Sequence, residues 1–114
     1  MGNNFATQEK HEILLETGTN EMEIIEFYLG IQPFGINVQK LKEIIPFDPV
    51  AVTAVPERAH SMLGTLLLRG SSIPLIDLKE HMGQRIKEAG EDFRQVVLVC
   101  EFNGRINGFL VDGV

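Results

Sequence analysis

Residues 95–111 read QVVLVCEFNGRINGFLV, and this stretch decides the fold class. Two apolar runs, Gln95 to Phe102 and Arg105 to Val111, flank the dipeptide Asn103-Gly104. Asn-Gly readily adopts the positive φ angles that a two-residue hairpin turn requires. The stretch therefore predicts a β-hairpin, and it is the strongest hairpin signal in the chain.

A second hairpin is predicted immediately upstream. Leu63 to Arg69 and Ser72 to Ile76 are β-rich and flank a turn that contains Gly70. Pro74 cannot donate a backbone hydrogen bond, so we expect the second of these strands to be an edge strand or an irregular one.

A third hairpin is predicted near the start, from Met22 to Leu29 and from Phe34 to Val38. A further short strand is expected from Val50 to Val55, because Pro56 bounds it.

Single helical turns are expected at residues 41–45, 56–60 and 78–82. The apolar residues of the first recur at helical spacing before Pro46, and the second begins with proline. The third follows Asp77, a good N-cap, and is closed by glycine.

About eight short strands with single-turn helices are typical of small β-barrels or a sandwich. Residues 1–20 are polar and predict a flexible lead-in, residues 84–94 an exposed loop, and residues 21–114 a single domain. Because Val114 follows a strand so closely, we expect a domain truncated at its C-terminal end. The unpaired strand edge would then favour a strand-exchanged homodimer.

Charge and hydropathy argue against two classes of partner. The 114 residues carry a net charge of -6 with Lys and Arg spread singly, whereas nucleic acids and anionic membranes attract clustered basic residues. No apolar run approaches the ~20 residues of a membrane span, and no signal peptide is recognisable. The 44% hydrophobic and 23% charged residues are ordinary for a soluble globular protein. With a single cysteine and no signal peptide, we expect the cytoplasm.

No motif for catalysis or metal binding stands out. Cys100 lies in an apolar run, which indicates a packed and inert thiol. Asp77 and His81 lie four residues apart, but a helix cap explains them better than a ligand set. We expect no cofactor and no metal; a small enzyme that uses Cys100, His60 and His81 is the alternative from another class.

Arg69 ends an apolar run directly before a turn glycine, so its guanidinium should emerge at the rim of a sheet. There it could pair with a carboxylate such as Glu43 or present its donors to a partner. Spacing alone leaves both roles open.

Several segments together resemble the CheW-like family of bacterial chemotaxis. Residues 34–45 (FGINVQKLKEII) are similar to its early hairpin, and residues 50–56 to the strand before its proline turn. Residues 64–78 (GTLLLRGSSIPLIDL) are similar to its most specific signature, and residues 108–114 (GFLVDGV) to its late strand. The lead-in at 12–21 resembles that of CheV proteins.

This resemblance implies an all-β fold of two intertwined, five-stranded SH3-like barrels with an apolar seam. It implies a non-catalytic adaptor located in the cytoplasm at membrane receptor arrays. One surface would meet the regulatory domain of the histidine kinase CheA. The groove between the barrels would take the hairpin tip of a chemoreceptor.

Individual residues acquire roles only through this resemblance. Leu41 and Gly64 correspond to positions linked to kinase binding. Receptor coupling is implied for Glu43, Arg69, Val96 and Val114. Turn or close-approach roles are implied for Gly35, Gly70 and Gly108.

The chain departs from the family pattern in two places. Leu67 stands where the signature has Asn, so that side chain's hydrogen bond is lost. The family's last helix and closing strand, and the receiver domain of a CheV, are not in this chain. A stand-alone CheW adaptor, a CheA regulatory domain and a generic SH3-like module remain alternatives.

Overall fold

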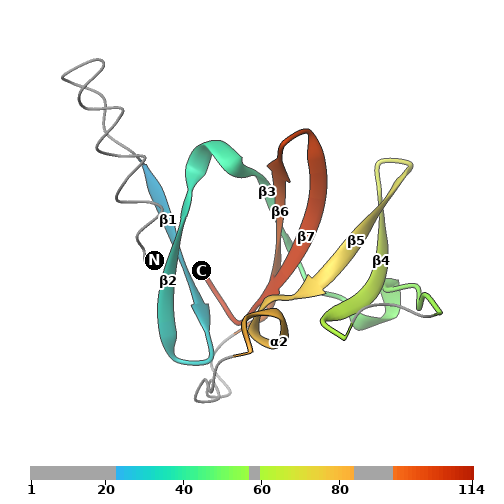
Figure 1. Cartoon of the computed structure of the whole chain (residues 1–114), viewed down its shortest axis with the longest axis horizontal. Coiled ribbons are helices and arrows are strands. Elements are labelled where there is room, and N and C mark those ends of the chain that lie inside the picture. Colours follow the sequence, from blue (N-terminus) through green and yellow to red (C-terminus); the bar gives the residue numbers. More distant parts are fainter. Residues whose placement is uncertain (1–22, 57–59, 84–93) are drawn as a thin grey trace.

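The computed structural model describes residues 23–56, 60–83 and 94–114. The hairpin predicted from residues 95–111 is present as β6 (Val96–Phe102) and β7 (Arg105–Val111), near the middle of the molecule (Figure 1). Asn103 and Gly104 have φ angles of 52° and 77°. Both angles are positive, as the predicted two-residue turn requires.

The described strands form two sheets. The first contains β1 (Ile24–Leu29) and β2 (Gln32–Asn37). The second has the order β3-β6-β7-β5-β4 and adds β3 (Leu41–Pro46), β4 (Met62–Leu68) and β5 (Ser71–Asp77). The helices that the structure describes are short: η1 (Val38–Lys40), η2 (Pro49–Ala51) and α2 (Leu78–Met82). The predicted all-β fold with short helices is confirmed.

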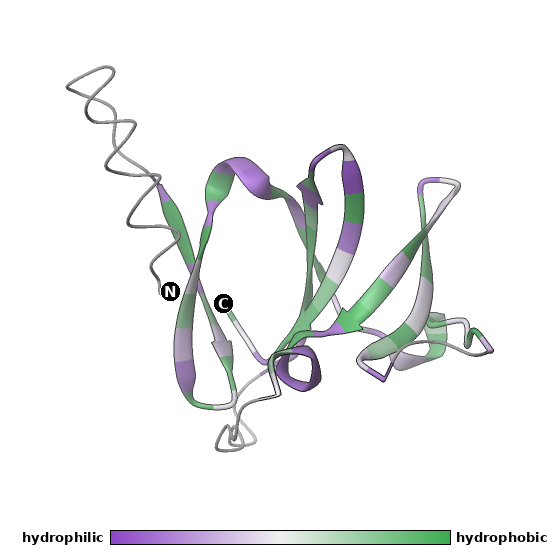
Figure 2. Cartoon of the chain, in the orientation of Figure 1, coloured by the Kyte–Doolittle hydropathy of each residue, from purple (hydrophilic) through white to green (hydrophobic). Residues whose placement is uncertain are grey.

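Strand β6 is buried on both faces, because it contributes alternately to two hydrophobic cores. We call these the first core and the second core. In Figure 2 the strands carry long hydrophobic stretches, whereas α2 is largely hydrophilic. The buried residues of the first core are Leu66, Ile73, Leu75, Val97, Val99 and Leu110. Those of the second core are Phe27, Leu29, Leu98, Cys100 and Val111.

The five-stranded sheet curls around the first core. Ile45 of β3 and Leu66 of β4 come from opposite edges of this sheet, yet both pack into that core. The second core lies instead between the five-stranded sheet and the β1–β2 hairpin, with α2 packed against its margin. The central strands β6 and β7 thus contribute residues to both cores.

The β4–β5 hairpin is confirmed, and its turn residues Arg69 and Gly70 have φ angles of 49° and 82°. The edge position predicted for the second strand was wrong, since β5 lies between β7 and β4. Strand β5 pairs with β7 only from Leu75 onward. Pro74 therefore lies just outside that ladder, where its missing N–H costs no bond to β7.

The helical turns predicted for residues 41–45 were wrong, because this segment is the strand β3. A β-bulge between Leu41 and Glu43 shifts the register against β6. Leu41 then lies opposite Cys100, and Ile44 lies opposite Leu98. The bulge breaks strict alternation and produces the three-residue spacing that imitates a helix.

The strand predicted from Val50 to Val55 was also wrong. Asp48 accepts a hydrogen bond from the backbone N–H of Val50 and begins η2, and only Thr53 forms a β-bridge, to Thr65. Helix α2 has the predicted Asp77 cap and ends at Gly83 in the left-handed conformation. The predicted turn at 56–60, loop at 84–94 and lead-in at 1–20 lie wholly or largely outside the described residues.

Candidate functional site

An ion pair joins the two edge strands of the curled sheet. Arg69 follows β4, and its guanidinium donates a hydrogen bond to the carboxylate of Glu43 on β3. That hydrogen bond, and then the charge of Glu43, raises the pKa of Arg69 above its ordinary value. The Arg69 side chain is 73% exposed and that of Glu43 is 26% exposed. The guanidinium is therefore held in one place while it still faces solvent.

We call the surface around the Arg69–Glu43 ion pair the charged rim, and a second ion pair extends it. Lys42 forms an ion pair with Glu101 of β6 at 2.7 Å. Leu67, two residues before Arg69, is 77% exposed. Because its neighbour Leu66 points into the first core, Leu67 points outward from the same strand. Glu43 lies on the first-core face of the sheet, so Leu67 projects from the opposite face.

Two other residues with implied roles lie at the second core. Leu41 and Val96 are both half-buried and pack against it. Glu43 lies opposite Val99, whose side chain belongs to the first core. Glu43 and Val96 therefore lie on opposite faces of the sheet, although both were implied to act in receptor coupling.

Val114 lies near the β1–β2 hairpin. It is 55% exposed and follows Gly113, whose backbone forms a bridge with Tyr28 of β1. The residues with implied receptor roles are thus spread over more than one face, and the hydrogen bond between Arg69 and Glu43 joins two of them.

The glycines with implied roles differ in their environment. Gly70 lies in a turn with open space around it, whereas Gly35 and Gly108 lie inside strands. A Cβ atom at Gly35 would lie 2.6 Å from Ile24, and one at Gly108 would lie 2.9 Å from Val97. These two are close-approach glycines and not turn residues. Gly64 is buried, and a Cβ atom there would collide with the carbonyl oxygen of Thr53.

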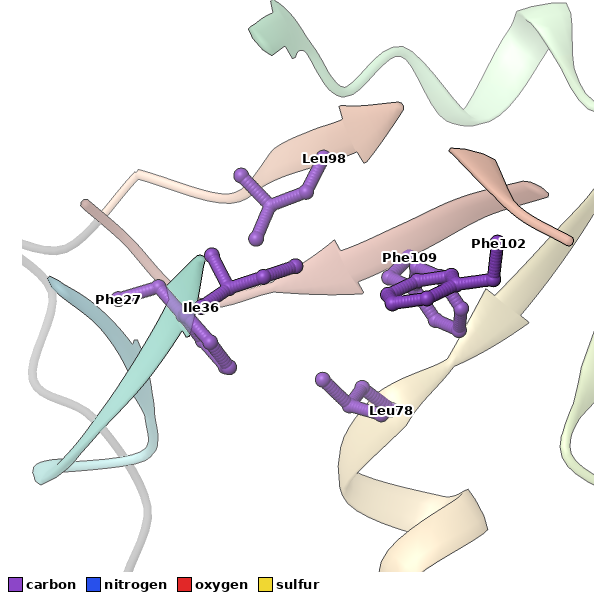
Figure 3. A pocket seen from close by; sticks show the side chains of 6 residues that line it. All are labelled: Phe27, Ile36, Leu78, Leu98, Phe102 and Phe109. Atoms are coloured by element: carbon purple, nitrogen blue, oxygen red, sulfur yellow. The ribbon is translucent and has the colours of Figure 1, made fainter. Parts of the chain in front are cut away.

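An apolar pocket opens at the second core. Its volume is about 130 Å³, and side chains from both sheets and α2 converge on it (Figure 3). Within its lining, Phe102 and Phe109 meet edge to face with ring centroids 6.3 Å apart. The ammonium of Lys40 lies 6.0 Å from the ring centroid of Phe102. The lining residues are Phe27, Ile36, Leu78, Leu98, Phe102 and Phe109.

The residues of the alternative enzyme hypothesis have other partners. Cys100 is fully buried, and burial raises the pKa of its thiol to about 11, so the thiol stays protonated at neutral pH. His60 pairs with Glu80 at 2.6 Å, and His81 lies 3.2 Å from the hydroxyl of Ser61. Within the described residues, no group of three or more His, Cys, Asp or Glu could hold a metal ion.

Asp112 was not singled out from the sequence. Its carboxylate is buried and accepts hydrogen bonds from three segments of the chain. The available signal was a lone acidic residue directly after an apolar strand. Alone, such a residue is equally consistent with an exposed turn.

These features define a class of protein. Two hydrophobic cores share the central β6–β7 hairpin. The surface carries a charged rim and an apolar pocket. Of the described helices, none is long and apolar enough to cross a membrane. The arrangement is that of an SH3-like β-domain whose surfaces suit protein–protein contact.

The chain belongs to the CheW-like domain family, whose model matches residues 23–114. It is 34% identical over 92 residues to the chemotaxis protein CheW of Rhizobium meliloti, covering 81% of this chain and 57% of that protein. It is 34% identical to the chemotaxis protein CheV3 of Helicobacter pylori, covering 81% of this chain and 31% of that one.

A solved structure supports the fold. The scaffolding protein TtCheW from Thermoanaerobacter tengcongensis matches with a TM-score of 0.68 at 28% identity. The match covers 81% of this chain and 60% of that one. The chain therefore spans less than two thirds of the length of these relatives.

Proposed function

We propose that this domain is a non-catalytic scaffold that couples chemoreceptors to the histidine kinase CheA. The observation that carries the proposal is the match to the CheW-like family over the whole described domain. The names of its relatives, chemotaxis proteins and a scaffolding protein, support it. Such coupling would take place in the cytoplasm at membrane receptor arrays, and it would act through interface geometry without a reaction.

The receptor-facing surface is proposed to include the charged rim. Arg69 supports this role because Glu43 orients an exposed guanidinium that can still donate to a partner. Val96 and Val114 would contribute from the opposite face and from the end of the described chain.

The kinase-facing surface is proposed to involve Leu41 and Gly64. Leu41 is half-buried on β3, so part of its side chain is available to a partner. Gly64 is buried, and we infer that it acts by allowing the backbone of Thr53 to approach β4. Its contribution would be to shape the surface and not to touch the kinase.

Edge pairing between copies is a further part of the proposal. Within the described residues, β1 pairs along one side with β2, and its other side forms a single bridge, between Tyr28 and Gly113. Such partly open edges favour strand exchange at high protein concentration. Analytical ultracentrifugation over a concentration series tests this: a homodimer is expected at high concentration, and a monomer throughout would contradict it.

Titration calorimetry with the regulatory domain of the cognate CheA tests the kinase surface. Wild-type chain and Arg69→Ala should both bind saturably, whereas Leu41→Asp should lose binding. Val50→Asp is the matched control, because Val50 is 91% exposed on η2 and lies outside both proposed surfaces. Circular dichroism must show that Leu41→Asp is folded, and Leu41→Ala replaces it if it is not. Equal binding by all four folded chains would overturn the assignment of Leu41.

A further inference from the structure

Among the described residues, Asp112 is the one buried charged side chain, with 8% of its surface exposed. Its carboxylate accepts a hydrogen bond from the backbone N–H of Gly30 at 2.5 Å. It also accepts from the ammonium of Lys79 and from the side-chain amide of Gln95, each at 3.3 Å. These donors belong to the β1–β2 turn, to α2 and to the segment that enters β6.

The backbone beside this carboxylate joins the same elements. Asp112 donates its N–H to the carbonyl of Tyr28 at 2.8 Å, and Tyr28 donates its N–H to the carbonyl of Gly113 at 2.9 Å. Together with the bond from Gly30, three hydrogen bonds connect β1 and its turn to residues 112–113. We call this set of contacts the Asp112 junction.

The β1–β2 hairpin needs such an attachment. A two-stranded hairpin is only marginally stable in water unless it packs against another element. This one packs through Phe27 and Leu29 onto the second core, whose pocket leaves part of the apolar lining uncovered. By contrast, the first core is enclosed by the curled five-stranded sheet, and neither its buried residues nor the hydrophobic residues packed against them come from the hairpin.

We propose that the Asp112 junction holds the β1–β2 hairpin on the five-stranded sheet. Loss of the carboxylate charge would release the hairpin and open the second core, while the first core stays folded. Hydrogen bonds to a buried charge are stronger than neutral ones, and removing one partner leaves the others unsatisfied. Release of the hairpin depends on no binding partner, so it can be tested whatever the domain binds.

Hydrogen–deuterium exchange of the full chain, read by mass spectrometry, tests this inference. In Asp112→Asn, peptides covering β1 and β2 should exchange about tenfold faster or more, while those covering β4 and β5 keep the wild-type rate. The opened second core should also bind the apolar dye ANS. Asp48→Asn is the matched control, because Asp48 is exposed and caps η2, which contributes no residue to the Asp112 junction.

Two outcomes would overturn the inference: unchanged exchange in β1 and β2, or equal acceleration in both hairpins. If Asp112→Asn does not fold, Lys79→Met carries the same test with a smaller expected effect. The double variant should accelerate exchange in β1 and β2 by less than the sum of the two single effects, because the contact between Lys79 and Asp112 is counted in both. Fully additive acceleration would show that the Lys79–Asp112 contact does not hold the hairpin and would contradict the junction.

Discussion

Gly64 packs so closely against the backbone of Thr53 that a side chain at this position would collide with it. Gly64→Ala should lower the free energy of unfolding by about 1–3 kcal/mol, because β4 or the Thr53 segment must shift. Urea unfolding followed by circular dichroism measures the change. Gly70→Ala is the control: it meets no atom within 4 Å and should cost only about 1 kcal/mol for its positive φ. An equal loss in the two variants would contradict the packing argument.

Cys100 gives a pH dependence with a definite sign. Burial raises the pKa of its thiol from 9.0 to about 11, so the unfolded chain ionises first as the pH rises. The protonated thiol therefore contributes to the free energy of unfolding. This contribution is fully present well below pH 9 and is lost as the pH rises through 11. Between pH 8 and 10.5 the free energy of unfolding should fall by about 2 kcal/mol from this group.

Urea unfolding at several pH values, with Cys100→Ala beside the wild type, isolates this contribution. The variant should be less stable than the wild type at pH 8, and its stability should fall less steeply as the pH rises. Parallel slopes would show that the thiol ionises equally in both states. In that case burial would not raise the pKa of the Cys100 thiol in the folded chain.

At the scale of elements, the cap of α2 can be tested directly. The carboxylate of Asp77 accepts a hydrogen bond from the backbone N–H of Glu80 at 3.4 Å. Asp77→Ala should destabilise the chain by about 1 kcal/mol, whereas Asp77→Asn should keep most of the stability because Asn also caps well. Thermal unfolding separates the two variants; similar melting temperatures would show that the cap contributes little.

Local signals in the sequence were enough for some elements. The Asn103-Gly104 turn, the Gly70 turn and the Asp77 cap each depend on neighbouring residues only, and the structure contains all three. Strand β3 could not be predicted this way. Its bulge opposite Cys100 is set by pairing with β6, which comes more than fifty residues later in the chain.

The candidate site also combines features that local sequence predicts with features that depend on distant residues. Arg69 was expected at a rim with Glu43 as one partner, but only the curl of the sheet brings the two edge strands close enough for the contact. The Asp112 junction was not predicted, since its three donors come from distant parts of the sequence. Contacts that depend on sheet closure carry no local sequence signal.

At the scale of the whole molecule, the rim should serve binding more than folding. Because Arg69 is largely exposed and solvent screens its charge, its ion pair should contribute little to stability. Arg69→Ala should therefore keep the melting temperature nearly unchanged while reducing receptor-dependent kinase activation about tenfold or more. Arg69→Lys keeps the charge without the planar fork and should restore only part of the activation. Full activation by Arg69→Ala would contradict a receptor role for the rim.

The most direct test of the coupling function combines this chain with CheA and receptor-containing membranes and measures kinase activity. We expect kinase activity to rise above the level of CheA and membranes alone when the chain is added. The rise should require receptors, and it should be lost in folded Leu41→Asp and strongly reduced in Arg69→Ala. No rise with a folded wild-type chain, or an equal rise with membranes that lack receptors, would contradict a coupling role for this domain.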